Sequence, residues 1–97
     1  MRQRHGSYFT QLAEEARKHA NETPIDPRWA CHVLGEALPE NAVISEETTV
    51  YRNLIQETIP RGSSQSYFAR ITGGLGVGLG YALGVKLALP DRPVFAL

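Results

Sequence analysis

Cysteine is nearly absent from this sequence of 97 residues, and neither sign of charge is in excess. The single cysteine, Cys31, excludes an internal disulfide and a Cys-x-x-Cys metal or redox motif, which favours a reducing compartment, the cytoplasm. Ten basic and ten acidic side chains give a formal charge of zero, so there is no basic patch to neutralise the phosphates of nucleic acid. A long apolar run near the N-terminus is also missing, which argues against a signal peptide.

The length is enough for one globular domain at most. Within it, residues 71–97 carry only Lys86, Asp91 and Arg92 as charged side chains, and six of the nine glycines lie between Gly73 and Gly84. Because so little charge remains there, we expect the C-terminal third of the chain to be buried.

The expected elements are typical of an α/β protein, because apolar strands without clean alternation belong to parallel sheets covered on both faces. In chain order they are helix 7–19, helix 27–38, strand 42–45, helix 50–57, a helix from the glycine cluster to residue 89, and strand 94–97. Two strands do not complete such a sheet. We therefore expect an incomplete parallel sheet, with its missing strands either absent or supplied by another copy of the chain.

The glycine-rich segment lacks the spacing of the common phosphate-binding loops. A dinucleotide G-x-G-x-x-G motif would need its third glycine at Leu79 or Tyr81, and no Gly-Lys pair forms a P-loop. The G-x-x-x-G spacing of a membrane helix is present, but Lys86 interrupts an apolar run shorter than the roughly 20 residues that span a bilayer. Two explanations stay open: close packing of a helix, or backbone groups at Gly73 and Gly74 exposed to a ligand.

Four segments in a fixed order carry a family resemblance. They are PENAVISEETT (39–49), SYF (66–68), GGLG (73–76) and GVKLALPDRPV (84–94). Together they resemble the C-terminal, diphosphate-binding domain of thiamine-diphosphate-dependent enzymes, in particular benzoylformate decarboxylases and acetolactate synthases. The resemblance implies only the N-terminal part of that domain. Residues 1–25 would be a linker and N-terminal helix, and residues 26–97 a partial cofactor-binding domain that stops before the family's Gly-Asp-Gly metal motif.

The resemblance also implies a cofactor site. It places Thr48 and Thr49 at the turn that contacts the cofactor diphosphate, where hydroxyl and N–H groups at a helix N-terminus would favour an anion. It places Gly73 where a backbone carbonyl accepts a hydrogen bond from the aminopyrimidine, with Gly74 beside it, and Leu75 where an apolar side chain holds the cofactor bent. The alternatives are that the threonines only cap the next helix and that Leu75 belongs to the core.

The implied function is part of an enzyme that decarboxylates or ligates 2-oxo acids, with thiamine diphosphate and Mg²⁺ as cofactors and a homo-oligomeric assembly. The chain matches no catalytic residue and no metal ligand set of that family, so we expect it to bind the cofactor weakly and to be inactive by itself. The alternative is a non-enzymatic interaction module in which the glycine-rich helix is an oligomerisation face. A membrane-associated helix ranks third.

The remaining candidate residues predict no chemistry. The three histidines, His5, His19 and His32, lack metal-ligand spacing and are expected at the surface. Cys31 is expected to be a buried thiol. Glu46 and Glu47 follow one another at the end of a strand, so their side chains should face opposite sides, which argues against paired-carboxylate chemistry.

Overall fold

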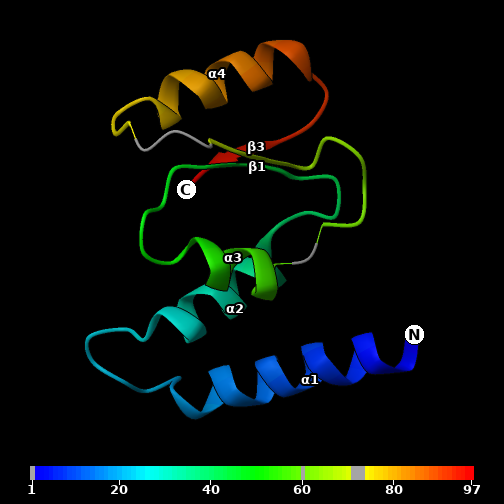
Figure 1. Cartoon of the computed structure of the whole chain (residues 1–97), viewed down its shortest axis with the longest axis vertical. Coiled ribbons are helices and arrows are strands. Elements are labelled where there is room, and N and C mark those ends of the chain that lie inside the picture. Colours follow the sequence, from blue (N-terminus) through cyan, green and yellow to red (C-terminus); the bar gives the residue numbers. More distant parts are fainter. Residues whose placement is uncertain (1, 60, 71–73) are drawn as a thin grey trace. The chain divides into compact units, whose positions relative to one another are not determined.

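The computed structural model describes residues 2–59, 61–70 and 74–97, which contain four helices and three strands (Figure 1). The chain divides into two compact units, Met1–Ala37 with Asn53–Pro60, and Leu38–Arg52 with Arg61–Leu97. Among the described residues, no helix is both long and apolar enough to cross a membrane.

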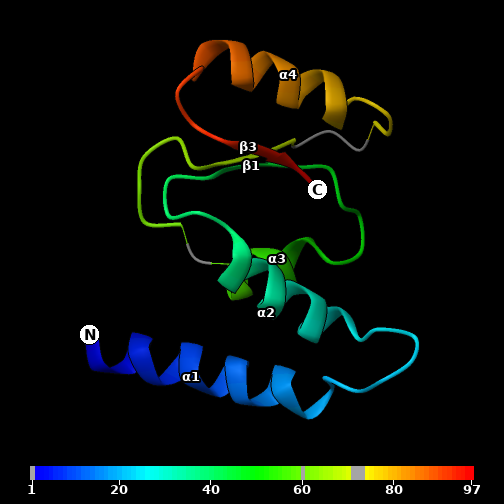
Figure 2. The same cartoon turned by 180° about the vertical axis from the view of Figure 1, so that it is seen from behind.

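The first unit is helical. It holds α1 (Arg2–Lys18), α2 (Pro27–Ala37) and most of α3 (Arg52–Thr58), and α1 packs against α2 (Figure 2). The start of α2 is the one that the Asp-Pro pair predicts, since an Asp26 side-chain oxygen accepts the backbone N–H of Arg28 at 2.8 Å. By contrast, α3 begins at Arg52, three residues after Thr49. The prediction that Thr48 or Thr49 caps this helix is therefore wrong.

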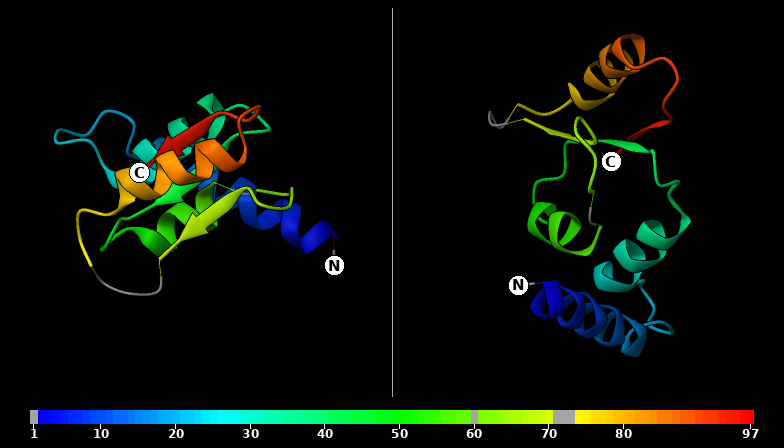
Figure 3. Two further views of the ribbon diagram at one scale, coloured as in Figure 1. Left: turned by 90° about the horizontal axis from the view of Figure 1, so that it is seen from above. Right: turned by 90° about the vertical axis from the view of Figure 1, so that its right-hand side faces the viewer.

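The second unit contains a parallel sheet of three strands in the order β2-β1-β3 (Figure 3). These are β1 (Val43–Glu46), β2 (Tyr67–Ala69) and β3 (Val94–Ala96), and Ile44 of β1 is paired with Tyr67 of β2 and Phe95 of β3. This sheet confirms the α/β class. The sequence did not predict β2, because three residues are too few to show a strand pattern and are defined as a strand only by pairing with β1.

The core of the second unit is the central strand. All four residues of β1 are buried, and Val43 and Ile44 are fully enclosed, as expected of a strand with neighbours on both sides. Helix α4 (Gly78–Ala88) lies along one face of this sheet, against β1 and β3, and buries Ala82 and Val85 (Figures 1 and 3).

The other face of α4 is open, so the expectation that the C-terminal third is buried is wrong for this helix. Leu79, Leu83 and Leu87 are 70%, 60% and 83% exposed. A Cβ atom added at Gly80 or Gly84 would meet nothing within 4 Å. Among the residues that the structure describes, the close approach that glycine permits is therefore not used at these two positions.

Candidate functional site

The candidate site lies at the carboxyl ends of the strands. Because β1 stands between β2 and β3, the chain leaves β1 toward one neighbour and later reaches the other. In open parallel sheets, a crevice forms outside the carboxyl ends of the strands where such connections diverge. The residues that follow these ends are 47–49 after β1, Arg70 after β2 and Leu97 after β3.

A cavity of about 200 Å³ lies at this edge. It is lined by Glu47, Thr48, Thr49, Arg52, Arg70, Gly74 and Leu75. The structure thus brings together four of the five residues that the resemblance selected, Thr48 and Thr49 with Gly74 and Leu75. The fifth, Gly73, lies outside the described residues. The two arginines were missed. Arg70 becomes part of the site only when β2 pairs with β1, whereas Arg52 lies three residues after Thr49 and no motif in the sequence marks it.

Glu46 holds two residues of the cavity wall in place. Its side chain is fully buried and accepts hydrogen bonds from Nε of Arg52 at 2.8 Å, the hydroxyl of Tyr67 at 3.3 Å and the hydroxyl of Thr48. A buried carboxylate needs such donors, because burial without them would be very costly. Glu46 therefore fixes the positions of Thr48 and Arg52, and the Thr48 hydroxyl hydrogen is already committed to it.

Glu47 faces a different partner. Its carboxylate accepts the backbone N–H groups of Val77 at 3.1 Å and Gly78 at 2.6 Å, at the N-terminus of α4. These two hydrogen bonds, and the nearby positive charge of Arg70, lower the pKa of Glu47 below its usual value. The two glutamates thus bind separate partners, as their alternation along the strand predicts, and they do not form a carboxylate pair.

Leu75 is 74% exposed and lines the cavity. The alternative that Leu75 is an ordinary core residue is therefore wrong. The position that requires glycine differs from the expected one. A Cβ at Gly74 would meet nothing within 4 Å, so space does not demand glycine there. Gly76 has a φ of 84°, a backbone conformation that favours glycine. The helix consequently begins only at Gly78 and not at the start of the glycine cluster.

The residues present fit the anionic end of a thiamine diphosphate better than its metal. The Thr49 hydroxyl and the guanidinium groups of Arg52 and Arg70 are the donors that diphosphate oxygens require. Mg²⁺ requires near-octahedral oxygen ligands. Among the described residues that line the cavity, Glu47 is the only carboxylate, and its oxygens already accept N–H groups.

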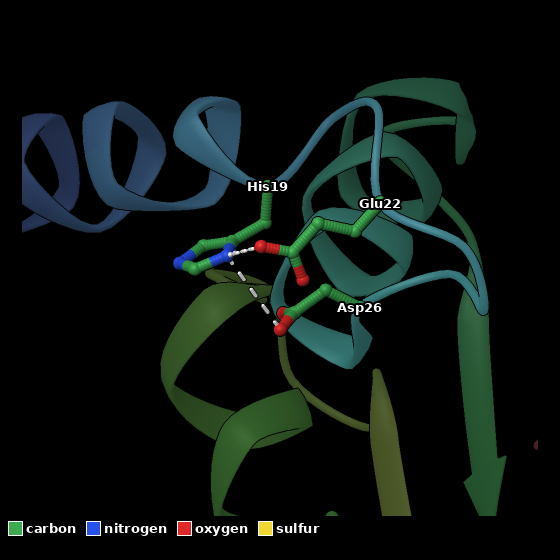
Figure 4. A group of neighbouring side chains, drawn as sticks. All are labelled: His19, Glu22 and Asp26. Atoms are coloured by element: carbon green, nitrogen blue, oxygen red, sulfur yellow. Dashed lines mark hydrogen bonds and ion pairs between the residues drawn. The ribbon is translucent and has the colours of Figure 1, made fainter.

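A second polar cluster joins α1 to α2 in the first unit (Figure 4). Ligand atoms of His19, Glu22 and Asp26 all lie within 4.8 Å of one another, and Nδ1 of His19 is 2.6 Å from a Glu22 oxygen. His19 is partly exposed, with 19% of its side chain accessible, so the expected surface position is confirmed only in part. Both carboxylate oxygens of Asp26 accept hydrogen bonds from the Arg28 guanidinium, at 2.9 and 2.8 Å, so the cluster is built as an ionic network.

Cys31 is a buried free thiol, as predicted, and burial raises its pKa. It therefore stays protonated near neutral pH, where a thiol is a poor nucleophile. His32 follows it in the chain but lies against the ring of Trp29, with 5.5 Å between the ring centroids.

Comparison with known proteins identifies three similar enzymes. The chain is 31% identical over 68 residues to a protein named as acetolactate synthase large subunit IlvX of Mycobacterium tuberculosis, covering 70% of this chain and 13% of that protein. It is 31% identical over 74 residues to benzoylformate decarboxylase of Pseudomonas aeruginosa, covering 76% and 14%. It is 35% identical over 79 residues to 2-hydroxyacyl-CoA lyase 2 of Mus musculus, covering 75% and 12%.

All three relatives are thiamine-diphosphate-dependent enzymes, which confirms the resemblance seen in the sequence. The chain spans between 12% and 14% of the length of these relatives. No protein-family profile matches the chain, and no solved structure matches it.

Proposed function

The chain is related to a segment of the thiamine-diphosphate-dependent decarboxylases and carboligases, and from this premise we propose that it contributes part of the cofactor site of an enzyme that acts on 2-oxo acids. One observation carries the proposal. The cavity at the carboxyl ends of β1 and β2 unites Thr48, Thr49, Gly74 and Leu75 with two arginines.

Each lining group has a role in holding the cofactor. The Thr49 hydroxyl would donate to a diphosphate oxygen, while Arg52 and Arg70 provide positive charge beside it. The exposed side chain of Leu75 would pack against the apolar body of the cofactor, with Gly74 presenting backbone groups next to it. Bound thiamine diphosphate supplies the carbanion chemistry, and the protein supplies orientation, which lowers a barrier by several kcal/mol when the geometry is held.

The proposal extends to the assembly in which the site works. A complete site needs Mg²⁺ ligands beyond the cavity residues described above, and we propose that it forms in a homo-oligomer in the cytoplasm, where the free thiol of Cys31 stays reduced. The 97 residues alone should bind the cofactor weakly and catalyse no reaction.

The site is tested by titrating thiamine diphosphate into the ¹⁵N-labelled chain and following backbone amide shifts. We expect weak binding, with shifts concentrated at Thr49, Arg52 and Leu75, because these residues line the cavity. Thiamine without its diphosphate should cause much smaller shifts. Thr49→Val, which removes one hydroxyl and keeps the shape, should weaken binding by about tenfold to a hundredfold, the worth of one hydrogen bond to a charged group.

Thr23→Val in the exposed linker is the matched control and should leave binding unchanged. Equal shifts from thiamine and thiamine diphosphate, or shifts confined to the first unit, would contradict the proposed site.

A second candidate function, self-association through α4, is favoured by the open face of that helix. Leu79, Leu83 and Leu87 form a ridge at four-residue spacing, and Gly80 and Gly84 form a furrow beside it at the same spacing. An apolar cavity of about 410 Å³ between α4 and β2 continues this furrow. Ridge and furrow of equal spacing on one helix are complementary to those of a second copy.

This second function predicts a mass that rises with concentration in analytical ultracentrifugation. Leu83→Glu should shift the chain to the monomer by placing a charge in the contact, whereas Glu36→Gln on α2, also exposed, should have no effect. A monomeric wild-type chain at several hundred micromolar would exclude it.

A further inference from the structure

Two places at this edge of the sheet attract an anion, one inside the cavity and one beside Glu47, which lines it. One is the end formed by Thr49, Arg52 and Arg70, which carries a hydroxyl and two guanidinium groups. The other is the N-terminus of α4, a helix of 11 residues whose first N–H groups have no partner within the helix. A diphosphate at this edge would therefore have two competing binding positions.

Glu47 already occupies the second position, the N-terminus of α4. Its carboxylate accepts the N–H groups of Val77 and Gly78, 30 and 31 residues further along the chain. The fit is close: a Cβ atom at position 78 would lie 2.8 Å from Cβ of Glu47, closer than real side chains approach, and would also collide with the Glu47 carboxylate. Glycine at position 78 is thus required by this one side chain, which makes the contact a built feature of the site.

The charge of Glu47 also acts inside the cavity, since Glu47 lines it together with Thr49 and Leu75. Glu47 would repel a negative group beside the N-terminus of α4. A negative group beside Thr49 would instead meet the positive charges of Arg70, which also acts on Glu47, and of Arg52, which is paired with Glu46. Ligands with one anionic end and one apolar end are the class that this distribution of charge accepts.

We propose that Glu47 is a specificity-determining residue of this site: its carboxylate stands in for a ligand anion at the N-terminus of α4 and directs the anionic group of the ligand to the threonine and arginine end. The inference rests on the diphosphate site proposed above and adds where in the cavity the anion is seated.

Titration of inorganic pyrophosphate, followed by backbone amide shifts, tests this assignment. In the wild-type chain, Thr49 and Arg52 should shift and Val77 and Gly78 should not. Glu47→Gln removes the charge while its amide oxygen still accepts an N–H, so pyrophosphate should bind roughly three- to tenfold tighter through loss of the nearby like charge. Glu47→Ala also vacates the helix terminus, so Val77 and Gly78 should now shift and their amide hydrogens should exchange faster.

A residue with a purely structural role would behave differently. Glu47→Gln would then leave the pyrophosphate affinity unchanged, which would overturn the proposal. Shifts of Val77 and Gly78 in the wild-type titration would overturn it as well. Glu40→Gln, an exposed charge change in the same unit, is the matched control and should not alter the affinity.

The unfolding midpoint separately tests the steric contact between Glu47 and residue 78. Gly78→Ala should lower this midpoint in the presence of Glu47 and should raise it in a Glu47→Gly background, because Glu47→Gly removes both the carboxylate and the Cβ atom that collide with residue 78, and alanine is then favoured in a helix. Equal effects in the two backgrounds would show that Glu47 does not impose the glycine.

The outcomes separate the two proposals. Binding at Thr49 that is insensitive to Glu47→Gln keeps the diphosphate site and rejects the role of Glu47. Binding that appears only at Val77 and Gly78 of Glu47→Ala rejects the diphosphate site and the directing role, and keeps only the occupation of the α4 N-terminus by the Glu47 carboxylate. No binding in any variant rejects both.

Discussion

Adjacent residues in this chain perform unlike tasks, and Glu46 and Glu47 show it most clearly. Glu46 is enclosed by Arg52, Tyr67 and Thr48 and supports the wall of the cavity, whereas Glu47 binds the N-terminus of α4. The alternation of a strand sends the two side chains to opposite sides. Nothing in the pair Glu-Glu itself distinguishes these roles.

The ionic cluster at the α1–α2 junction makes stability depend on pH. The hydrogen bond that the His19 ring donates to Glu22 raises the pKa of His19 above its ordinary value of about 6.5, and Asp26 adds to this while Arg28 and burial oppose it. Glu15 also faces the ring, at 3.6 Å. Because the folded pKa is raised, the stabilisation is fully present below about pH 6.5 and is lost as the pH rises through the folded pKa.

We therefore predict that the melting temperature of the wild-type chain falls relative to that of His19→Gln as the pH rises from 6 to 8.5. Glu22→Gln should bring the pKa of His19, measured by the NMR shifts of its ring protons, back toward its ordinary value. A His19 that titrates at or below pH 6.5 in the wild-type chain would contradict the prediction.

At the scale of the secondary-structure element, α4 stands out in the second unit for its uncovered apolar face. Three glycines lie in its interior or first turn, yet only Gly78 has a neighbour that requires the missing side chain. The single cation of α4, Lys86, donates to the carbonyl oxygens of Pro90 and Arg92 and so closes the C-terminal turn. The outward face is left apolar and without charge.

Gly80→Ala and Gly84→Ala should each stabilise the chain by about 0.5 to 1 kcal/mol, because alanine loses less backbone entropy in a helix and both positions have open space. Urea denaturation at low protein concentration measures this. If α4 pairs with a second copy through its furrow, the same substitutions should also weaken self-association at high concentration. Destabilisation of the dilute monomer would show that the furrow is filled from within the chain.

For the whole molecule, the two candidate functions predict different effects of a longer chain on cofactor affinity. Extending the chain past Leu97 with the Gly-Asp-Gly motif of the family would add carboxylate oxygen near the carboxyl end of β3, whose Leu97 carbonyl accepts the N–H of Glu47 at 2.8 Å. Mg²⁺ prefers such ligands together with phosphate oxygens.

The cofactor-site proposal predicts that this extension tightens the binding of thiamine diphosphate at least tenfold in the presence of Mg²⁺, measured by isothermal titration calorimetry. A Gly-Asn-Gly extension is the control and should give a smaller gain. An interaction module built on α4 predicts no gain from either, so identical affinities would favour the second function.

Much of the local structure follows from neighbours in the sequence. Asp26 and Pro27 predict the start of α2, and the buried run 42–45 predicts β1 within one residue. Capping and hydrophobic periodicity act over a few residues, so the sequence alone contains them. The family resemblance and the threonine, glycine and leucine positions of the site were available from the sequence for the same reason, since they stand in short continuous segments.

The remaining features depend on contacts between distant residues, which local patterns do not encode. Tyr67–Ala69 becomes a strand only beside β1. Arg70 enters the site only because β2 pairs with β1, and Glu47 meets Val77 and Gly78 across 30 and 31 residues. The exposure of Leu79, Leu83 and Leu87 could not be predicted either, because composition indicates that an apolar helix should be covered but does not state which surface covers it. Sheet pairing and the packing of α4 decided these features.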